Sequence, residues 1–128
     1  MKQKEIYCEK ELGKRHGPYV QGLRYNDLIF TTQIATLSNG EMLDGDAYEQ
    51  TIQTLKNTEA ILKAEGSSLA NILKCTIYVL DYDNDFDQVN QAYKELMISE
   101  PLPARACVQV CKMAAGAKVE MEIVAYAE

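Results

Sequence analysis

The sequence predicts an α+β domain in which two helices pack on one face of a mixed β-sheet. Two segments carry apolar residues at helical spacing, and the segments around them show the alternation or the β-branched content of strands. In chain order these elements follow the pattern ββαβαββ. A chain of 128 residues has the length of one domain, so we expect residues 1–128 to form a single unit.

The first two strands are predicted to form a hairpin. Gly17-Pro18 signals a turn, and the segments 19–24 and 28–34 flank a second turn signal at Asn26-Asp27. The second of these segments is rich in β-branched and aromatic residues, as strands are. Residues 1–16 are polar and charged without sustained periodicity, so no regular element is predicted there.

Each predicted helix is marked by a cap and by an apolar stripe. Asp46 and Glu49 have the spacing of a capping box, and Gly66 supplies a left-handed stop, which predicts a helix over 46–65. The stripe of this helix consists of Tyr48, Ile52, Leu55 and Leu62. The acidic loop 81–85 supplies caps for the second helix, which ends before a proline-rich segment. The second stripe consists of Phe86, Val89, Tyr93, Leu96 and Met97.

Three further strands complete the predicted sheet. Residues 71–80 alternate, so that one face is made by Leu73, Cys75, Ile77 and Val79. The last two strands, 104–111 and 118–126, are joined by a short loop, and we therefore expect them to be antiparallel neighbours. Helices on one face leave the other face open, and that face carries Val and Ile as well as charges. A symmetric oligomer is the simplest cover for such a face.

Charge and hydropathy argue against several classes of protein. The net charge is −6, whereas a nucleic-acid binder neutralises phosphates with clustered Lys and Arg. The one short basic cluster, Lys10 with Lys14 to His16, is interpreted as a solvated loop. No apolar run approaches the roughly 18 residues of a membrane helix. The N-terminal segment also lacks the apolar core of a signal peptide.

The cysteines and the single histidine favour neither a metal site nor a disulfide. Cys107 and Cys111 are predicted to lie on one strand face, roughly 13 Å apart. That separation is too long for a disulfide or for two ligands of one zinc ion. With His16 as the lone histidine, we predict no metal. Free thiols fit a reducing cytoplasm, where we expect the protein to reside.

Alternation along the last two strands gathers polar groups on one predicted face. Arg105 and Cys107 share this face in one strand, and Glu120 and Glu122 share it in the other. An arginine in this place could bind a carboxylate through its planar fork, and a nearby glutamate could activate water. The competing interpretation is a structural Arg–Glu pair on a half-wet sheet face.

Pattern alone gives structural explanations for three other residues. Cys107 fits a small core hydrophobe, Tyr19 an ordinary strand aromatic, and Asn90 a solvated helix residue. The residues by themselves therefore lead to an oligomeric α+β domain with one polar face.

Six motifs along the chain resemble those of the RidA/YjgF family. They run in family order from about residue 17 to 125, and although each is weak alone, together they are specific. The motifs are Gly17 to Gly22 (GPYVQG), Asn57, Lys74-x-Thr76, Phe86-x-x-Val89-Asn90-x-x-Tyr93, Pro103 to Val108 (PARACV) and Val119 to Glu122 (VEME).

The resemblance implies a chorismate-mutase-like fold and a homotrimer whose open sheet faces form a central barrel, with pockets between subunits. It implies hydrolysis of reactive 2-imino or enamine acids such as 2-aminoacrylate to 2-oxo acids and ammonia, without a metal or organic cofactor. By position, Arg105 would bind the substrate carboxylate, and Glu120 would orient the attacking water or shuttle a proton. Cys107 would line the pocket, and Tyr19 and Asn90 would shape it.

The chain departs from the family at the end of its second predicted strand. Thr31-Thr32-Gln33 stands where the family has Ser-Gly-Gln. Thr31 keeps the hydroxyl and is expected to bind substrate, whereas Thr32 adds bulk where the family has glycine. Two alternatives to deamination stay open. One is capture of a small carboxylate metabolite without turnover, and the other is the endoribonuclease or translation-inhibitor activity with which some family members are labelled.

Overall fold

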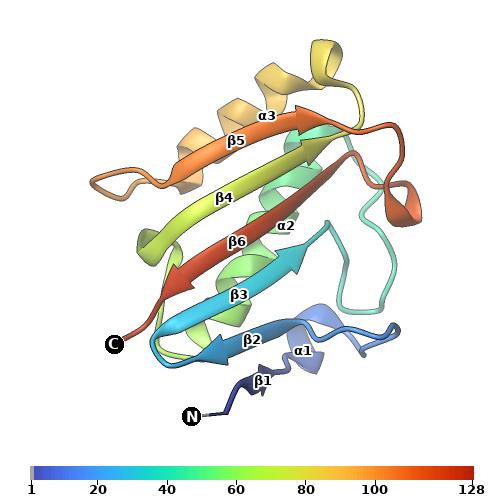
Figure 1. Cartoon of the computed structure of the whole chain (residues 1–128). Helices are drawn as coiled ribbons and strands as arrows, with labels where there is room; N and C mark the ends of the chain where they lie inside the picture. The colour runs from blue at the N-terminus through green and yellow to red at the C-terminus, as the bar shows by residue number, and fades with distance from the viewer. Residues whose placement is uncertain (1) are drawn as a thin grey trace.

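The computed structural model describes residues 2–128 and shows one six-stranded mixed sheet with two long helices on one face (Figure 1). The strands are β1 (Lys4–Ile6), β2 (Gly22–Tyr25), β3 (Leu28–Gln33), β4 (Ile72–Val79), β5 (Ala104–Gln109) and β6 (Val119–Tyr126). The helices are α1 (Glu9–Leu12), α2 (Ala47–Lys63) and α3 (Tyr82–Leu96), with 3₁₀ turns η1 (Leu69–Asn71) and η2 (Ala114–Gly116). The α+β class and the placement of both long helices on one face confirm the prediction.

The strand order is β1-β2-β3-β6-β4-β5. β4 and β5 are parallel, and all other neighbouring pairs are antiparallel. β5 and β6 are therefore not neighbours, and the expectation that they pair across a short loop is wrong. The physical reason is the crossover through α3, which returns β5 parallel to β4 on its outer side. β6 then fills the place between β3 and β4.

The core lies between β6, β4 and the inner face of α2. β6 pairs on both edges, and its inward residues are at most 1% exposed: Val119, Met121, Ile123 and Ala125. The stripe of α2 supplies Leu55 and Leu62, which are fully buried, together with Ile61. Burial of side chains of this size stabilises the fold by about 1.5–3 kcal/mol each.

The local signals in the sequence place α2 correctly. Asp46 accepts a hydrogen bond from the Glu49 backbone N–H at 2.8 Å, and Glu49 accepts one from the Asp46 N–H at 3.1 Å. Gly66 follows the helix with φ of +74°, as a left-handed stop requires. α3 is capped by Asp81, so it begins inside the segment that was predicted to be an acidic loop.

Two features of the fold differ from the predictions. β1 and α1 lie within residues 1–16, where no regular element was expected, because β1 gains its hydrogen bonds from β2 and not from any periodicity of its own. Leu73 is 46% exposed and does not share the buried face of Cys75. An irregularity in the pairing of β4 with β6 at Ile72 to Lys74 shifts the alternation there.

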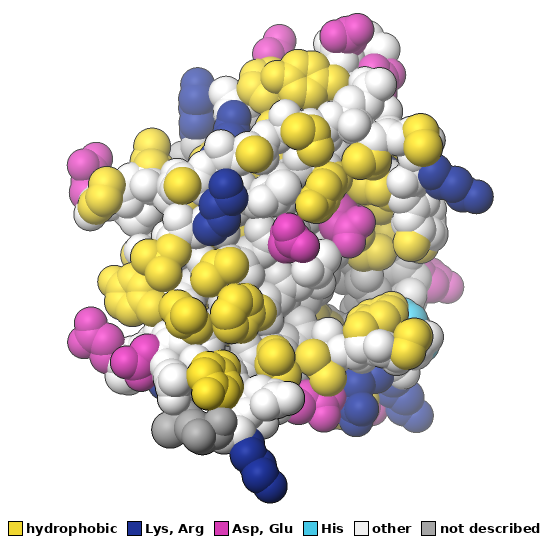
Figure 2. Space-filling model, viewed as in Figure 1, with side chains coloured by type: hydrophobic (Ala, Val, Ile, Leu, Met, Phe, Trp, Pro, Cys, Tyr) yellow, Lys and Arg dark blue, Asp and Glu magenta, His cyan; other side chains and the backbone are white. Residues whose placement is uncertain are grey.

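The uncovered face of the sheet carries exposed apolar side chains. Figure 2 shows this face with hydrophobic groups spread over it and acidic groups near its middle. The large hydrophobic residues exposed along these strands include Tyr25, Leu28, Phe30, Leu73 and Val108, each between 38% and 46% exposed. None of the helices in residues 2–128 combines the length and the apolar character that a membrane crossing needs.

We expect Asp46→Ala to destabilise the domain by about 1 kcal/mol, because it leaves the Glu49 backbone N–H without its capping acceptor. Denaturant-induced unfolding measures the change. Asp44→Ala is the matched control, since Asp44 is exposed and lies outside α2. Equal stability of the Asp46 and Asp44 variants would contradict the assigned cap.

Candidate active site

Arg105 lies on β5 with its side chain turned toward α3. It pairs in register with Cys75, which is fully buried beneath the helices. The Arg105 Nη1 donates a hydrogen bond to Asn90 Oδ1 at 2.8 Å, and its Cζ lies 4.7 Å from the centre of the Tyr93 ring. Asn90 and Tyr93 both come from α3. The structure therefore brings the predicted residues Arg105 and Asn90 together, and the predicted role of Asn90 as a solvated residue is wrong.

The thiols near Arg105 are held in their protonated form. Cys107 lies two residues further along β5 and packs partly against the core. Burial raises the pKa of the Cys107 thiol, although the charge of Arg105 opposes this shift. Burial also raises the pKa of Cys75 to about 12. A thiolate nucleophile is therefore disfavoured here, and the place of Cys107 in a pocket wall stays a prediction. Cys111 lies beyond the end of β5, not on its face as predicted.

Glu120 lies on β6 and faces the uncovered side of the sheet. Burial first, and then the charge of Glu122, raise the pKa of the Glu120 carboxyl. Tyr78 donates a hydrogen bond to Glu122 at 3.3 Å, so the second carboxylate is fixed beside the first. A carboxyl with a raised pKa holds a proton more readily than an ordinary carboxyl, which suits it to both accept and donate a proton.

Arg105 and Glu120 lie on opposite faces of the sheet, and the prediction that one face gathers both is wrong. Both strands pair with β4, where Cys75 is the partner of Arg105 and Tyr78 is the partner of Glu120. Because side chains alternate along a strand, residues three apart point to opposite sides. The error follows from the strand order, since β4 lies between the two strands that were expected to pair.

A cavity of about 540 Å³ adjoins Glu120 on the uncovered side. Its other lining residues are Tyr19, Val20, Leu23, Phe30, Thr31, Thr32, Ile34 and Ala114. Tyr19 is 61% exposed, so its ring stands at the mouth and not in the core. The apolar part of this wall was not predicted from the sequence. Leu23 on β2 and Phe30 on β3 alternate with residues that face the helices, and this alternation could have identified them.

The side chain of Thr31 points away from this cavity. Its hydroxyl donates to the Gln21 carbonyl at 2.7 Å and accepts from Gln33 Nε2 at 2.9 Å. Thr31 is 5% exposed, and its hydroxyl connects β3 to Gln21, the residue before β2. Thr32, the next residue, faces the cavity instead. The substrate contact expected from Thr31 therefore has no support from its side chain.

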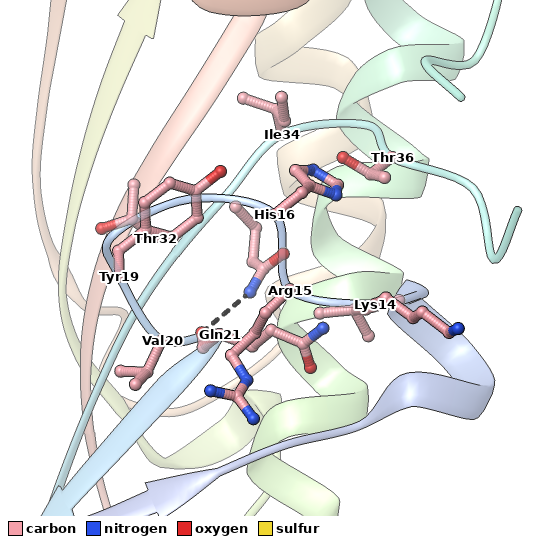
Figure 3. A pocket seen from close by; sticks show the side chains of 11 residues that line it. Lys14, Arg15, His16, Tyr19, Val20, Gln21, Thr32, Ile34 and Thr36 are labelled. Atoms are coloured by element: carbon pink, nitrogen blue, oxygen red, sulfur yellow. Dashed lines mark hydrogen bonds between the residues drawn. The ribbon is translucent and has the colours of Figure 1, made fainter. Parts of the chain in front are cut away.

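The segment before β2 forms a smaller pocket beside the same cavity (Figure 3). In this view Tyr19 and Thr32 lie together at one end, and His16 lies further along the pocket. A Cβ atom at Gly17 would be 2.1 Å from Cε2 of Tyr19, so the absence of a side chain at residue 17 lets the ring fold back over the loop. Gly17-Pro18 therefore shapes the position of Tyr19.

The predicted residues thus fall into two groups. We name Arg105, Asn90 and Cys107 the Arg105 half-site. We name Glu120 and Tyr19 the Glu120 half-site, together with Thr32, which was not predicted and takes the place expected for Thr31 at the cavity. The half-sites are separated by the sheet itself. No cluster of three or more His, Cys, Asp or Glu side chains suited to hold a metal ion occurs among residues 2–128.

Comparisons with known proteins match nearly the whole chain. The family profile described as Endoribonuclease L-PSP matches residues 10–127. A RutC family protein of Pyrococcus abyssi is 35% identical over 98% of both chains. TdcF of Escherichia coli K12, whose proposed activity is the deamination of reactive intermediates, is 35% identical over 85% of this chain and 86% of its own.

Solved structures agree with these sequence matches. Crystalline E. coli TdcF with bound serine superposes with a TM-score of 0.87 at 33% identity, covering 98% of this chain and 99% of TdcF. RidA from the Antarctic bacterium Psychrobacter sp. PAMC 21119 has a TM-score of 0.88 at 29% identity, covering 97% and 99% of the two chains.

We expect Glu122→Gln to lower the pKa of the Glu120 carboxyl, because it removes a negative charge that disfavours ionisation of Glu120. The pKa should remain above its ordinary value, since burial is the larger cause of the shift. Carbon-13 NMR of the Glu120 carboxyl across a pH titration measures both values. Glu41→Gln, at an exposed site, is the control. An unchanged or higher Glu120 pKa in the Glu122 variant would show that the two carboxylates are not coupled.

Proposed function

Because this chain belongs to the Endoribonuclease L-PSP family, which includes the RidA and TdcF proteins, we propose that it hydrolyses reactive 2-imino and enamine acids such as 2-aminoacrylate. The products are a 2-oxo acid and ammonia. The observation that carries the proposal is the guanidinium of Arg105, which is held in place by α3 without an acidic partner. TdcF, at 35% identity, supports the reaction class, and its crystal holds serine, a small molecule with a carboxylate.

Arg105 is the proposed binding group for the substrate carboxylate. A guanidinium has five N–H donors arranged as a fork that matches two carboxylate oxygens. Asn90 accepts from Nη1 only, which leaves donors for a second, bidentate partner. Fixing the carboxylate in this way orients the adjacent imine carbon toward an attacking water.

Glu120 is the proposed proton carrier for hydrolysis. Water adds to the carbon of the protonated imine and gives a proton to the Glu120 carboxylate, which yields a neutral carbinolamine. Glu120 then returns this proton to the carbinolamine nitrogen, and the C–N bond breaks to release ammonia. The Glu120 carboxylate takes the hydroxyl proton as the C=O bond of the 2-oxo acid forms. The raised pKa of Glu120 suits both steps, because a carboxyl that is too acidic would not hold the proton.

The two half-sites require two copies of the chain in this proposal. Arg105 and Glu120 lie on opposite faces of one sheet, so a single chain does not present both to one substrate. The uncovered face bears exposed hydrophobic residues that association would bury. We therefore propose a homotrimer in which these faces form a central barrel, with the Arg105 half-site of one copy meeting the Glu120 half-site of the next. Free thiols at all four cysteines suit the cytoplasm, where we place this activity.

A second candidate function is capture of a small carboxylate without turnover. The observation that favours it is Thr32, which lines the cavity beside Glu120 and adds bulk at the position of the family glycine. RNA cleavage, the activity in the family's description, is opposed by the net charge of −6. Release of ammonia separates deamination from both alternatives.

We expect Arg105→Ala to lower kcat/KM for imine hydrolysis by about 100-fold, because it removes charged hydrogen bonds to the substrate carboxylate. A serine dehydratase generates 2-aminoacrylate in place, and semicarbazide traps what is not hydrolysed. The wild-type protein should divert the imine to pyruvate, and the Arg105 variant should not. Lys10→Ala removes one positive charge from exposed α1 and is the control. Full turnover by a correctly assembled Arg105 variant would refute the role of Arg105.

We expect inactive Arg105→Ala chains and inactive Glu120→Gln chains to restore activity when they are unfolded, mixed and refolded together. If each site takes Arg105 from one copy and Glu120 from its neighbour, random mixing leaves on the order of a quarter of the sites intact. Each variant refolded alone is the control. A mixture with no more activity than its components would show that both groups act within one chain.

A further inference from the structure

Three residues on one face of α3 surround the guanidinium of Arg105. Phe86, Asn90 and Tyr93 are spaced by four and three residues, so their side chains lie above one another along the helix. The Arg105 Cζ lies 4.7 Å from the Tyr93 ring centre and 5.8 Å from the Phe86 ring centre. Both distances fall within the range in which a cation is attracted to an aromatic face.

No acidic side chain takes part in this arrangement. Within residues 2–128, the ion pairs connect Lys4, Arg15, Arg24 and Lys63 with glutamates, and none of them involves Arg105. An acidic partner would hold a guanidinium equally well but would cancel its charge and occupy its fork. Two ring faces and one amide oxygen hold the group and leave its charge available to a ligand.

Tyr93 contributes through its ring and not through its hydroxyl. The residue is 5% exposed, and its hydroxyl is buried without a hydrogen-bond partner in the described chain. Burial raises the pKa of Tyr93 to about 12, so the hydroxyl stays protonated. An unpaired buried hydroxyl disfavours folding, so the contacts that stabilise Tyr93 are those of its ring, which packs in the core and against Arg105.

Phe86 is held in turn by Tyr82 in the first turn of α3. The two rings stack with centres 4.8 Å apart and an angle of 23° between their planes. The stack restrains Phe86, which is only partly buried, and keeps its ring near the guanidinium. Figure 1 shows α3 on the covered side of the sheet next to β5, and Tyr82, Phe86, Asn90 and Tyr93 follow one another along this helix.

We propose that Phe86, Asn90 and Tyr93 form an aromatic clamp that fixes the Arg105 guanidinium with its charge unneutralised, which makes Phe86 and Tyr93 positioning residues for carboxylate recognition. The inference rests on the proposed role of Arg105 as the carboxylate-binding group. It also defines the ligand class, because a ligand that carries an uncharged amide in place of the carboxylate gains nothing from a preserved positive charge.

Binding of 2-oxobutyrate, a stable 2-oxo acid, tests the clamp in the assembled full-length protein by calorimetry. Tyr93→Leu should weaken binding about tenfold, because it removes the closer ring face. Tyr93→Phe should bind within twofold of wild type, because it keeps the ring and loses only the unpaired hydroxyl. 2-Oxobutanamide should show no such difference between the variants.

Val89→Ala is the matched control for loss of packing. Val89 lies on α3 and is 1% exposed, and valine offers neither a ring face nor a hydrogen bond to a guanidinium, so its truncation should lower stability but leave 2-oxobutyrate affinity unchanged. Nitrogen-15 NMR of Arg105 supplies a readout that needs no ligand. Slow rotation of the guanidinium should be seen in wild type and in Tyr93→Phe, and fast averaging in Tyr93→Leu.

The outcomes separate failure of the clamp from failure of the proposed function. Equal affinity and equal guanidinium rotation in wild type and Tyr93→Leu would overturn the clamp. So would an equal loss of affinity in Tyr93→Phe or in Val89→Ala, since the hydroxyl or general stability would then be responsible. If wild type binds no 2-oxo acid, the proposed function fails, and the NMR comparison still decides whether the rings hold Arg105.

Discussion

The position of β4 between β5 and β6 decides on which side of the sheet Arg105 and Glu120 lie. β4 pairs parallel with β5 and antiparallel with β6, and the two registers set the side of the sheet on which each outer residue lies. Arg105 is carried to the helix side and Glu120 to the uncovered side. The crossover through α3 imposes this order, because a parallel return needs a connection long enough to contain a helix.

The same crossover explains why α3 both packs on the sheet and contacts Arg105. Its inner face must pack on the sheet, and Val89 and Ala92 are almost completely buried there. Its flank lies beside β5, the edge strand, where Phe86, Asn90 and Tyr93 meet Arg105. An edge strand leaves an arginine partly open to solvent on one side, while the helix holds it on the other.

Local chemistry in the sequence was sufficient to predict both long helices and the strands β2 to β6, but not β1, α1 or the order of the strands. The capping box at Asp46 and the stop at Gly66 lie within the chain segment that they organise, so the sequence alone locates α2. The pairing of β6 with β3 and β4 depends on contacts between distant segments, and a short connecting loop favoured the wrong partner for β6. β1 depends on β2 in the same way. The candidate site inherits this limit, since the strands that carry Arg105 and Glu120 were predicted but the faces on which the two side chains lie were not.

The aromatic residues of α3 show why the apolar periodicity of a helix does not reveal a role in ligand binding. Phe86 and Tyr93 recur at the spacing of a core stripe, and the pattern of apolar residues is the same whether a ring packs on a methyl group or on a guanidinium. The two cases differ in the group that the ring contacts. Here that group is Arg105, which lies on β5 and not on α3 itself. Holding a cation by ring faces keeps its full charge in a partly buried place, where a carboxylate is attracted more strongly than in water. In the proposed site, core packing and ligand binding therefore depend on the same side chains.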